Sequence, residues 1–225
     1  MKSARAPTVI DSGPLMTARE APRPFRPPWP INQFVLPRGL LGRIAGQAMS
    51  FFNASIEARA IGLLDLTGDE RVLEIGFGPG VGIRMLAERL GRGRIAGIDP
   101  SQTMIDMASS RNRRAIADGT VDLRKGLVSH LPWPDASFDG ILSTNNVQLW
   151  ESVGSALKEV ARVLAPGGRV AIAVYAWIAP RGGPPFDEYL RDALAAAGLV
   201  DIKVWREWVR VGPALLARAV KRSLI

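Results

Sequence analysis

A short glycine-rich stretch, VLEIGFGPGVG at residues 72–82, has the composition of a ligand-binding loop. An apolar run that carries one acid, Glu74, leads into four alternating glycines that end at Gly82. Glycine lets the main chain approach a ligand without an intervening side chain. A strand followed by such a turn and a helix presents free backbone N–H groups at the carboxyl edge of a sheet, where open α/β sheets bind their ligands.

The loop taken alone leaves two interpretations open. The dinucleotide-binding pattern G-x-G-x-x-G would need glycines at positions 76, 78 and 81, but position 81 is a valine. The other interpretation is a tight structural turn that holds no ligand. The elements on either side of the loop therefore have to be considered.

Those elements alternate in type. Short apolar runs that predict strands are separated by stretches with the spacing and end signals of helices. This alternation predicts an α/β fold, a doubly wound and mostly parallel seven-stranded sheet with helices on both faces. We expect strands near 71–77, 93–100, 121–126, 137–145, 169–177, 201–209 and 213–221, and helices near 80–91, 101–117 (with Ser101 as N-cap), 153–168 (stopped by Pro166 and the glycines after it) and 186–198.

Two segments precede this alternating region. Seven of the 17 prolines fall within the first 30 residues, so residues 1–37 are expected to be extended or disordered. Residues 38–66 carry apolar side chains at near-helical spacing and predict an N-terminal extension of one or two helices. This extension either closes over the site as a lid or simply packs on the sheet, and residues 67–225 form the ligand-binding domain.

The composition excludes several kinds of site. There is no cysteine, so disulfides, thiolate metal sites and thiol nucleophiles are absent. His130 is the only histidine, which rules out a multi-histidine metal centre, and we expect no metal. No apolar run approaches the roughly 20 residues that span a bilayer, and the N-terminus lacks the apolar core of a secretory signal. We therefore expect a soluble, cytoplasmic protein.

The net charge of +8 is unevenly distributed. Residues 1–44 and residues 203–225 each carry +5, so the central part of the chain carries −2. This distribution favours solvated basic ends over a nucleic-acid-binding surface. A more specific interpretation is that the basic ends steer an anionic acceptor or make transient contact with a membrane.

Four motifs, in this order and at this spacing, resemble those of the class I S-adenosylmethionine-dependent methyltransferases. VLEIGFGPG is similar to the first motif, GIDPSQTMIDMA to the second-strand motif, LPWPDASFDGIL to the stretch entering the fourth strand and RVLAPGGRVAI to the lead into the fifth. Dinucleotide enzymes share only the first two features. The resemblance implies a Rossmann-like fold, S-adenosylmethionine as methyl donor and S-adenosylhomocysteine as product.

The resemblance also implies which residues hold the cofactor. Asp99, at the end of the second strand, would accept both ribose hydroxyls, and Glu74 would face the methionyl ammonium directly or through water. Many members place an aspartate for the adenine amino group where this chain has Leu127, which predicts a less polar adenine pocket. The expected cofactor-binding residues are Glu74, Gly76, Phe77, Gly78, Gly80, Asp99, Pro100, Met104, Leu127, Val128 and Asn145.

The acceptor should be a small molecule, because the chain distantly resembles quinone C-methyltransferases; an apolar, lipid-like or secondary-metabolite acceptor is expected. Methyl transfer from a sulfonium is an in-line displacement, so the protein mainly aligns the acceptor and excludes water. Asn146 and Gln148 are candidates to orient the acceptor, with turn chemistry as the alternative, and His130 fits a solvated loop better than a general base. The candidate acceptor-site residues are Asn146, Trp150, Tyr175, Trp177 and Phe52.

Two other functions remain as alternatives. One is a nucleic-acid methyltransferase that binds its nucleic acid through the basic terminal segments. The other is a cofactor-binding protein whose chemistry does not transfer a methyl group.

Overall fold

The computed structural model describes residues 39–180 and 185–223 of the 225-residue chain. The proline-rich segment expected at residues 1–37 lies outside them. The strands are β1 (Arg71–Ile75), β2 (Arg94–Asp99), β3 (Val121–Lys125), β4 (Phe138–Thr144), β5 (Leu164–Tyr175), β6 (Leu199–Val209) and β7 (Gly212–Lys221). The helices are α1 (Gly39–Leu63), α2 (Val81–Arg89), α3 (Gln102–Arg111), α4 (Arg113–Ala117), α5 (Val153–Val163) and α6 (Phe186–Ala196), with a short 3₁₀ turn, η2 (Val147–Leu149).

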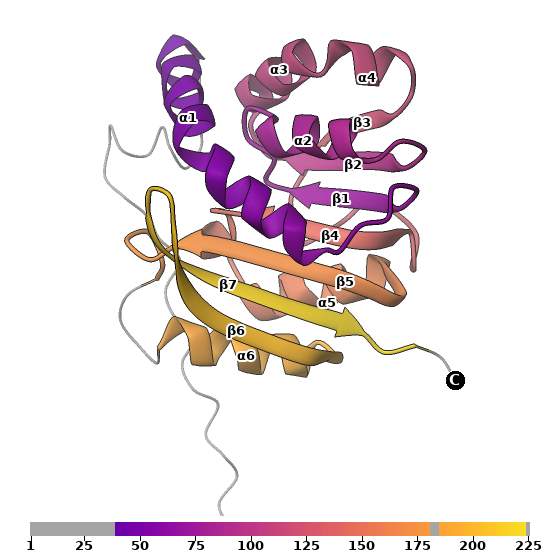
Figure 1. The fold of residues 1–225 in the computed structure, drawn as a ribbon, viewed down its shortest axis with the longest axis vertical. Helices are drawn as coiled ribbons and strands as arrows, with labels where there is room; N and C mark the ends of the chain where they lie inside the picture. The colour runs from indigo at the N-terminus through magenta and orange to yellow at the C-terminus, as the bar shows by residue number, and fades with distance from the viewer. Residues whose placement is uncertain (1–38, 181–184, 224–225) are drawn as a thin grey trace, which may run out of the picture.

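The strands form one seven-stranded sheet in the order β3-β2-β1-β4-β5-β7-β6 (Figure 1). Neighbours from β3 to β5 are parallel, whereas β7 runs antiparallel to both β5 and β6. The expectation of a doubly wound, mostly parallel sheet is therefore confirmed. Strand order reverses at β1, which lies between β2 and β4, and such a switch point is where open α/β sheets place their ligands.

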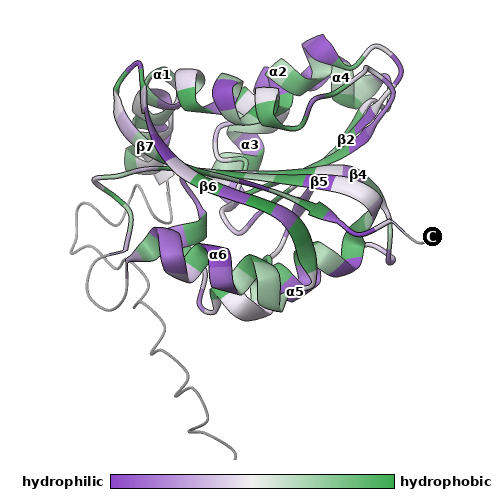
Figure 2. Cartoon of the chain, turned by 60° about the horizontal axis from the view of Figure 1, so that its bottom comes forward, coloured by the Kyte–Doolittle hydropathy of each residue, from purple (hydrophilic) through white to green (hydrophobic). Residues whose placement is uncertain are grey.

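Two apolar layers hold the helices against the sheet. In Figure 2, α1, α2, α3 and α4 lie on one side of the sheet and α5 and α6 on the other. One core cluster joins the sheet to α5 and α6, and the second joins it to α1, α2 and α3. Burial on both faces explains why the central strands read as continuous apolar runs in the sequence.

Some element boundaries differ from the sequence-based expectation. Helix α5 ends at Val163, before the expected stop at Pro166, because Leu164 is already buried and paired with Phe138 as the first residue of β5. The expected helix at 101–117 is two helices divided at Asn112. The side-chain amide of Asn112 donates to the carbonyls of Gly80 and Ala108, which fixes this break against the glycine loop.

The N-terminal extension is a single helix of 25 residues, α1, which crosses the sheet face near β4 and β5 (Figure 1). Arg59 on α1 makes a two-pronged ion pair with Glu207 on β6, with Nε–Oε1 and Nη2–Oε2 distances of 2.5 and 3.0 Å. The Tyr175 hydroxyl donates to the carbonyl of Phe52 at 3.1 Å. These contacts fix α1 to the sheet at two separate places.

Helices long and apolar enough to cross a bilayer are absent from residues 39–180 and 185–223.

The conformation of Gly80 yields a test of how the loop is held. Gly80 precedes α2 with φ of +78°, and a Cβ added there would lie 2.7 Å from Ala108 Cβ. We expect Gly80→Ala to lower the free energy of unfolding by roughly 2–4 kcal/mol, because backbone strain and overlap with α3 add together. Gly91→Ala is the matched control, since a Cβ there meets nothing within 4 Å and no positive φ is required. Equal denaturant midpoints for the two variants would contradict this account.

Candidate functional site

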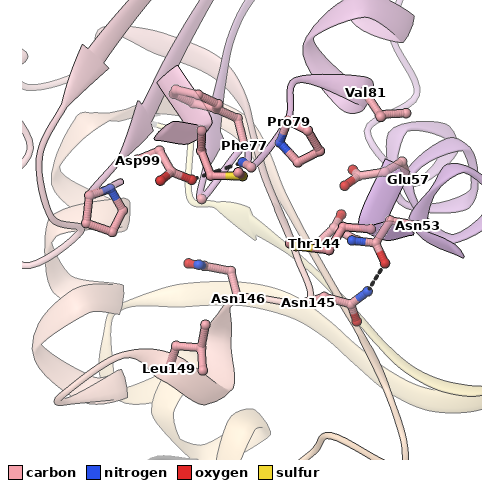
Figure 3. A pocket seen from close by; sticks show the side chains of 15 residues that line it. Asn53, Glu57, Phe77, Pro79, Val81, Asp99, Thr144, Asn145, Asn146 and Leu149 are labelled. Atoms are coloured by element: carbon pink, nitrogen blue, oxygen red, sulfur yellow. Dashed lines mark hydrogen bonds between the residues drawn. The ribbon is translucent and has the colours of Figure 1, made fainter. Parts of the chain in front are cut away.

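A cavity lies at the carboxyl ends of β1, β2 and β4, beneath α1 (Figure 3). It encloses about 570 Å³, counting the part open to solvent. The lining residues come from α1, from the β1–α2 loop and the start of α2, from the β2–α3 turn and the start of α3, and from the end of β4 through η2: Met49, Asn53, Glu57, Gly76, Phe77, Gly78, Pro79, Val81, Asp99, Pro100, Met104, Thr144, Asn145, Asn146 and Leu149.

The glycines of the loop are required by its geometry. Gly76 and Gly78 have φ of +71° and +52°, in the left-handed region that side chains disfavour. A Cβ at Gly76 would overlap the side-chain amide of Asn146, so this turn also leaves room for the opposite wall of the cavity. The expectation that the loop brings bare main chain to a ligand site agrees with this arrangement.

Asp99 connects the loop to β2 and α3. Its Oδ2 accepts from the Gly78 N–H at 2.9 Å and its Oδ1 from the Ser101 N–H at 2.8 Å. Ser101 caps α3 as expected, because its side chain accepts from the Met104 N–H. Burial raises the pKa of Asp99 to about 6. Each carboxylate oxygen can accept more than one hydrogen bond, so Asp99 retains acceptor capacity toward the cavity.

Two further carboxyl groups lie on the α1 side of the site. Glu74 on β1 is 1% exposed and Glu57 on α1 is 6% exposed, but only Glu57 lines the cavity. Burial raises the pKa of Glu57 to about 7. Burial and the charges of Glu57 and Asp99 hold the pKa of Glu74 well above its usual value.

Helix α1 contributes more to the cavity than the sequence analysis identified. Met49, Asn53 and Glu57 are four residues apart, which places them on one face of the helix, and all three line the cavity. Met49 and Glu57 were not among the expected site residues, although their spacing is visible in the sequence. The proposed acceptor residue Phe52 is half exposed and lies outside the lining.

The two asparagines after β4 make different contacts. Asn145 has φ of +49°; its Nδ2 donates to Asn53 Oδ1 at 3.0 Å and its Oδ1 accepts from the Tyr175 N–H at 2.9 Å. Both ends of its side chain are therefore used within the protein. Asn146 has its Oδ1 occupied by the indole N–H of Trp150 at 2.6 Å, which fixes the orientation of its amide at the cavity wall (Figure 3).

The remaining candidates at this sheet edge support the site from outside its lining. Gln148 is buried and donates to the Asn145 carbonyl at 2.8 Å. Trp150 belongs to the core on the α5 side. Tyr175 is buried, and its ring stacks on that of Trp177 with centroids 4.3 Å apart.

The loop between β3 and β4 also lies outside the cavity lining. Leu127 is 57% exposed, His130 is exposed and Val128 packs against the core. Of the expected residues, the structure therefore brings together Gly76, Phe77, Gly78, Asp99, Pro100, Met104, Asn145 and Asn146, and leaves Glu74, Gly80, Leu127, Val128, Gln148, His130, Trp150, Tyr175, Trp177 and Phe52 outside the lining.

Comparison with known proteins identifies the family. Residues 73–172 match the model of the Methyltransferase domain family. An uncharacterized methyltransferase of Bacillus subtilis, YdaC, is 29% identical over 181 residues, which cover 79% of this chain and 98% of that protein. The matched part of the chain is a class I S-adenosylmethionine-dependent methyltransferase domain. This methyltransferase is also similar to a demethylmenaquinone methyltransferase of Tropheryma whipplei, 35% identical over 132 residues that cover 59% of this chain and 53% of that protein.

The solved structures agree on the fold. The crystal structure of a SAM-dependent methyltransferase from Aquifex aeolicus superposes with a TM-score of 0.62 at 21% identity, covering 76% of this chain and 92% of that one. The expected family, enzyme class and methyl donor are thus confirmed, with S-adenosylhomocysteine as the product. The roles of individual residues remain predictions.

Proposed function

We propose that this methyltransferase transfers the methyl group of S-adenosylmethionine to a small apolar or lipid-like acceptor, and that it acts mainly by positioning. The observation that carries the proposal is the mixed character of the cavity. Asp99, Asn146 and Asn53 supply fixed polar groups, whereas Met49 and Leu149 supply apolar surface. Apolar surface combined with a few placed polar groups is typical of small-molecule sites.

The residues at the loop side of the cavity fit the cofactor. Asp99 is a buried carboxylate with acceptor capacity left for hydroxyl groups, as a ribose requires. Gly76 and Gly78 allow close approach of the main chain, and Pro100 and Met104 offer apolar surface for an adenine ring. When bound, the sulfonium supplies a methyl group that is already activated for displacement.

Asn146 is the residue that we assign to the acceptor. Because Trp150 occupies its Oδ1, the amide presents Nδ2 as a donor of fixed direction. A neutral amide can orient an oxygen-bearing acceptor but is a poor base at neutral pH. This arrangement supports catalysis by alignment and exclusion of water over catalysis by proton abstraction.

The named relatives support a small acceptor. The Tropheryma whipplei relative is a demethylmenaquinone methyltransferase, whose name specifies a quinone, although this chain spans about half of its length. We therefore expect label from methyl-labelled S-adenosylmethionine to enter small apolar acceptors such as quinones, with a product heavier by one CH₂. Incorporation into RNA or DNA but into none of the small acceptors would overturn the proposal.

The placement of Asp99 predicts a large effect on cofactor affinity. We expect Asp99→Ala to weaken binding of S-adenosylhomocysteine by roughly 2–4 kcal/mol, because charge-assisted hydrogen bonds to the ribose are lost. The same variant loses the hydrogen bonds that Asp99 accepts from the N–H groups of Gly78 and Ser101, which adds to the loss of affinity. Asp106→Ala, which replaces an exposed acid on α3 that accepts from Gln102, is the control. If calorimetric titration gave wild-type affinity for a folded Asp99→Ala protein, the proposed contact of Asp99 with the ribose would be wrong.

The geometry of Asn146 predicts a kinetic contrast with His130. We expect Asn146→Ala to lower kcat by more than about tenfold while cofactor affinity stays unchanged, because the acceptor is misaligned. Trp150→Phe keeps an aromatic ring in the core but removes the N–H donor to Asn146, so it should also lower kcat. His130→Ala should stay within about tenfold of wild type, since positioned bases supply roughly 10²–10⁴-fold. Steady-state kinetics on the three variants test this prediction. A large loss of kcat in His130→Ala alone would identify the histidine as a base.

A further inference from the structure

The large apolar side chains that remain exposed are unevenly distributed over the molecule. Within residues 39–180 and 185–223 eight such side chains are exposed, and all except Leu127 lie on α1, after β5 or on the β6–β7 hairpin. Exposed apolar side chains that gather in one place mark interaction sites, whereas scattered ones do not. Six of them define a surface that we call the apolar rim: Leu41, Ile44, Phe51, Phe52, Trp177 and Trp208.

Helix α1 is apolar on two different sides. One side carries Ile56 and Ala60, which are buried in the core against the sheet. The other side carries the four α1 residues of the rim, whose helical spacing places them on one face. Each of the four is at least half exposed, so no described element covers this face. A helix side that faces water normally carries polar residues, so the packing of the chain on itself does not account for the rim.

The two tryptophans extend the rim from α1 to the end of the sheet. The Tyr175 hydroxyl donates to the Phe52 carbonyl at 3.1 Å, and the Tyr175 ring stacks on Trp177 with centroids 4.3 Å apart. A Cβ on Gly212 would overlap the Trp177 ring, which places this ring against the β6–β7 hairpin. Trp208 on the same hairpin is 76% exposed. Figure 1 and Figure 2 both show the hairpin beside α1, so the rim is one continuous region.

The apolar rim lies at the same edge of the sheet as the cavity. Trp177 follows the carboxyl end of β5, and Tyr175 at that end pairs with Ala214, so the tip of the hairpin extends past this edge. Helix α1 belongs to both features, because Asn53 lines the cavity and the preceding Phe52 is part of the rim. A surface that contacts the rim is therefore brought to the edge where the cavity lies.

The charges beside the rim are positive. Arg43 on α1 and Arg210 in the hairpin are exposed, and neither forms an ion pair within the described part of the chain. The acid of the hairpin, Glu207, is paired with Arg59, and the acid of α1, Glu57, is buried. Apolar surface flanked by uncompensated positive charge is complementary to an anionic partner.

These charges disfavour two occupants of the rim and favour a third. A second copy in a twofold contact would bring the same arginines against each other. Residues 1–38, which precede α1, carry six basic and two acidic side chains and would also add positive charge. An anionic lipid surface accepts both features, because apolar side chains enter the acyl boundary, tryptophan favours the interface and arginine binds the phosphates.

We propose that the apolar rim docks this methyltransferase on an anionic lipid surface, from which the cavity receives an apolar acceptor. The proposal rests on the proposed function, since a lipid-like acceptor is concentrated in a bilayer. The sequence suggested membrane contact through the basic ends alone, whereas the structure assembles the apolar side chains that would enter the bilayer. Phe51 and Trp208 supply this apolar contact, and Arg43 and Arg210 supply contact with the lipid phosphates.

Sedimentation of the full chain with vesicles tests the docking, with phosphatidylcholine alone compared with an equal mixture of phosphatidylcholine and phosphatidylglycerol. We expect wild type to bind the anionic vesicles at least about tenfold more tightly than the neutral ones. Phe51→Ser and Trp208→Ser should each weaken this binding by about tenfold, because each removes a side chain that is buried on docking. Arg43→Gln combined with Arg210→Gln should weaken it by roughly tenfold or more. Leu127→Ser, which replaces an exposed apolar residue outside the rim, is the matched control and should bind as wild type.

Methyl transfer to the same acceptor, added in solution or embedded in anionic vesicles, tests the delivery. Phe51→Ser and Trp208→Ser should lower kcat/KM by about tenfold for the embedded acceptor and leave it unchanged for the dissolved one. Equal loss with both forms of the acceptor would overturn the proposal, because the substitutions would then act on the site itself.

Three results of the binding experiment would also overturn the proposal. One is that wild type binds neither kind of vesicle or both equally. Another is that Phe51→Ser and Trp208→Ser bind as wild type, which would assign vesicle binding to the basic ends alone. The third is a wild-type dimer in light scattering that Phe51→Ser converts to a monomer, because a second copy would then cover the rim. If wild type docks on anionic vesicles as expected but methylates no small acceptor in either form, the proposed function fails and the docking stands.

Discussion

The turn between β1 and α2 sets the position of the groups that face the cavity, because it is held from three sides. Asp99 accepts from the Gly78 N–H, Asn112 donates to the Gly80 carbonyl and Arg111 donates to the Pro79 carbonyl. Asp99 ends β2, Arg111 ends α3, and Asn112 is the residue that follows α3. The positive φ angles of the glycines make this tight path possible. The same contacts therefore hold the glycine loop at the strand switch point.

The second wall of the cavity depends on α1, which lies outside the alternating α/β pattern. Its docking uses an ion pair to β6, a hydroxyl contact from β5 and the amide contact from Asn53 to Asn145. The same docking buries Glu57 beside Glu74 without a cation, an arrangement that costs free energy in the ligand-free protein. Buried charges of this kind, which lack a compensating partner, are found mainly at functional sites.

Asn145 and Asn146 are neighbouring residues of the same type, but their side chains make different contacts. Asn145 is held by β5 and α1, so its side chain joins α1 to the sheet. The side-chain oxygen of Asn146 accepts from the indole N–H of Trp150, which belongs to the core on the α5 side. The core on the α5 side therefore orients a group in a cavity on the α1 side, which makes this wall of the cavity sensitive to packing on both faces of the sheet.

The sequence by itself determined the α/β alternation, the glycine loop, the Ser101 cap and the place of Asp99, because each follows from a local pattern of period, glycine spacing or capping chemistry. It did not determine that α5 ends at Val163, where pairing of the next residue with β4 overrides the helix signal. Nor did it place Met49 or Glu57 in the cavity. Those positions depend on α1 docking across the sheet, through contacts such as that between Arg59 and Glu207, which are 148 residues apart. Only the tertiary structure brings such distant residues together, since no local pattern in the chain encodes which helix face meets which strand.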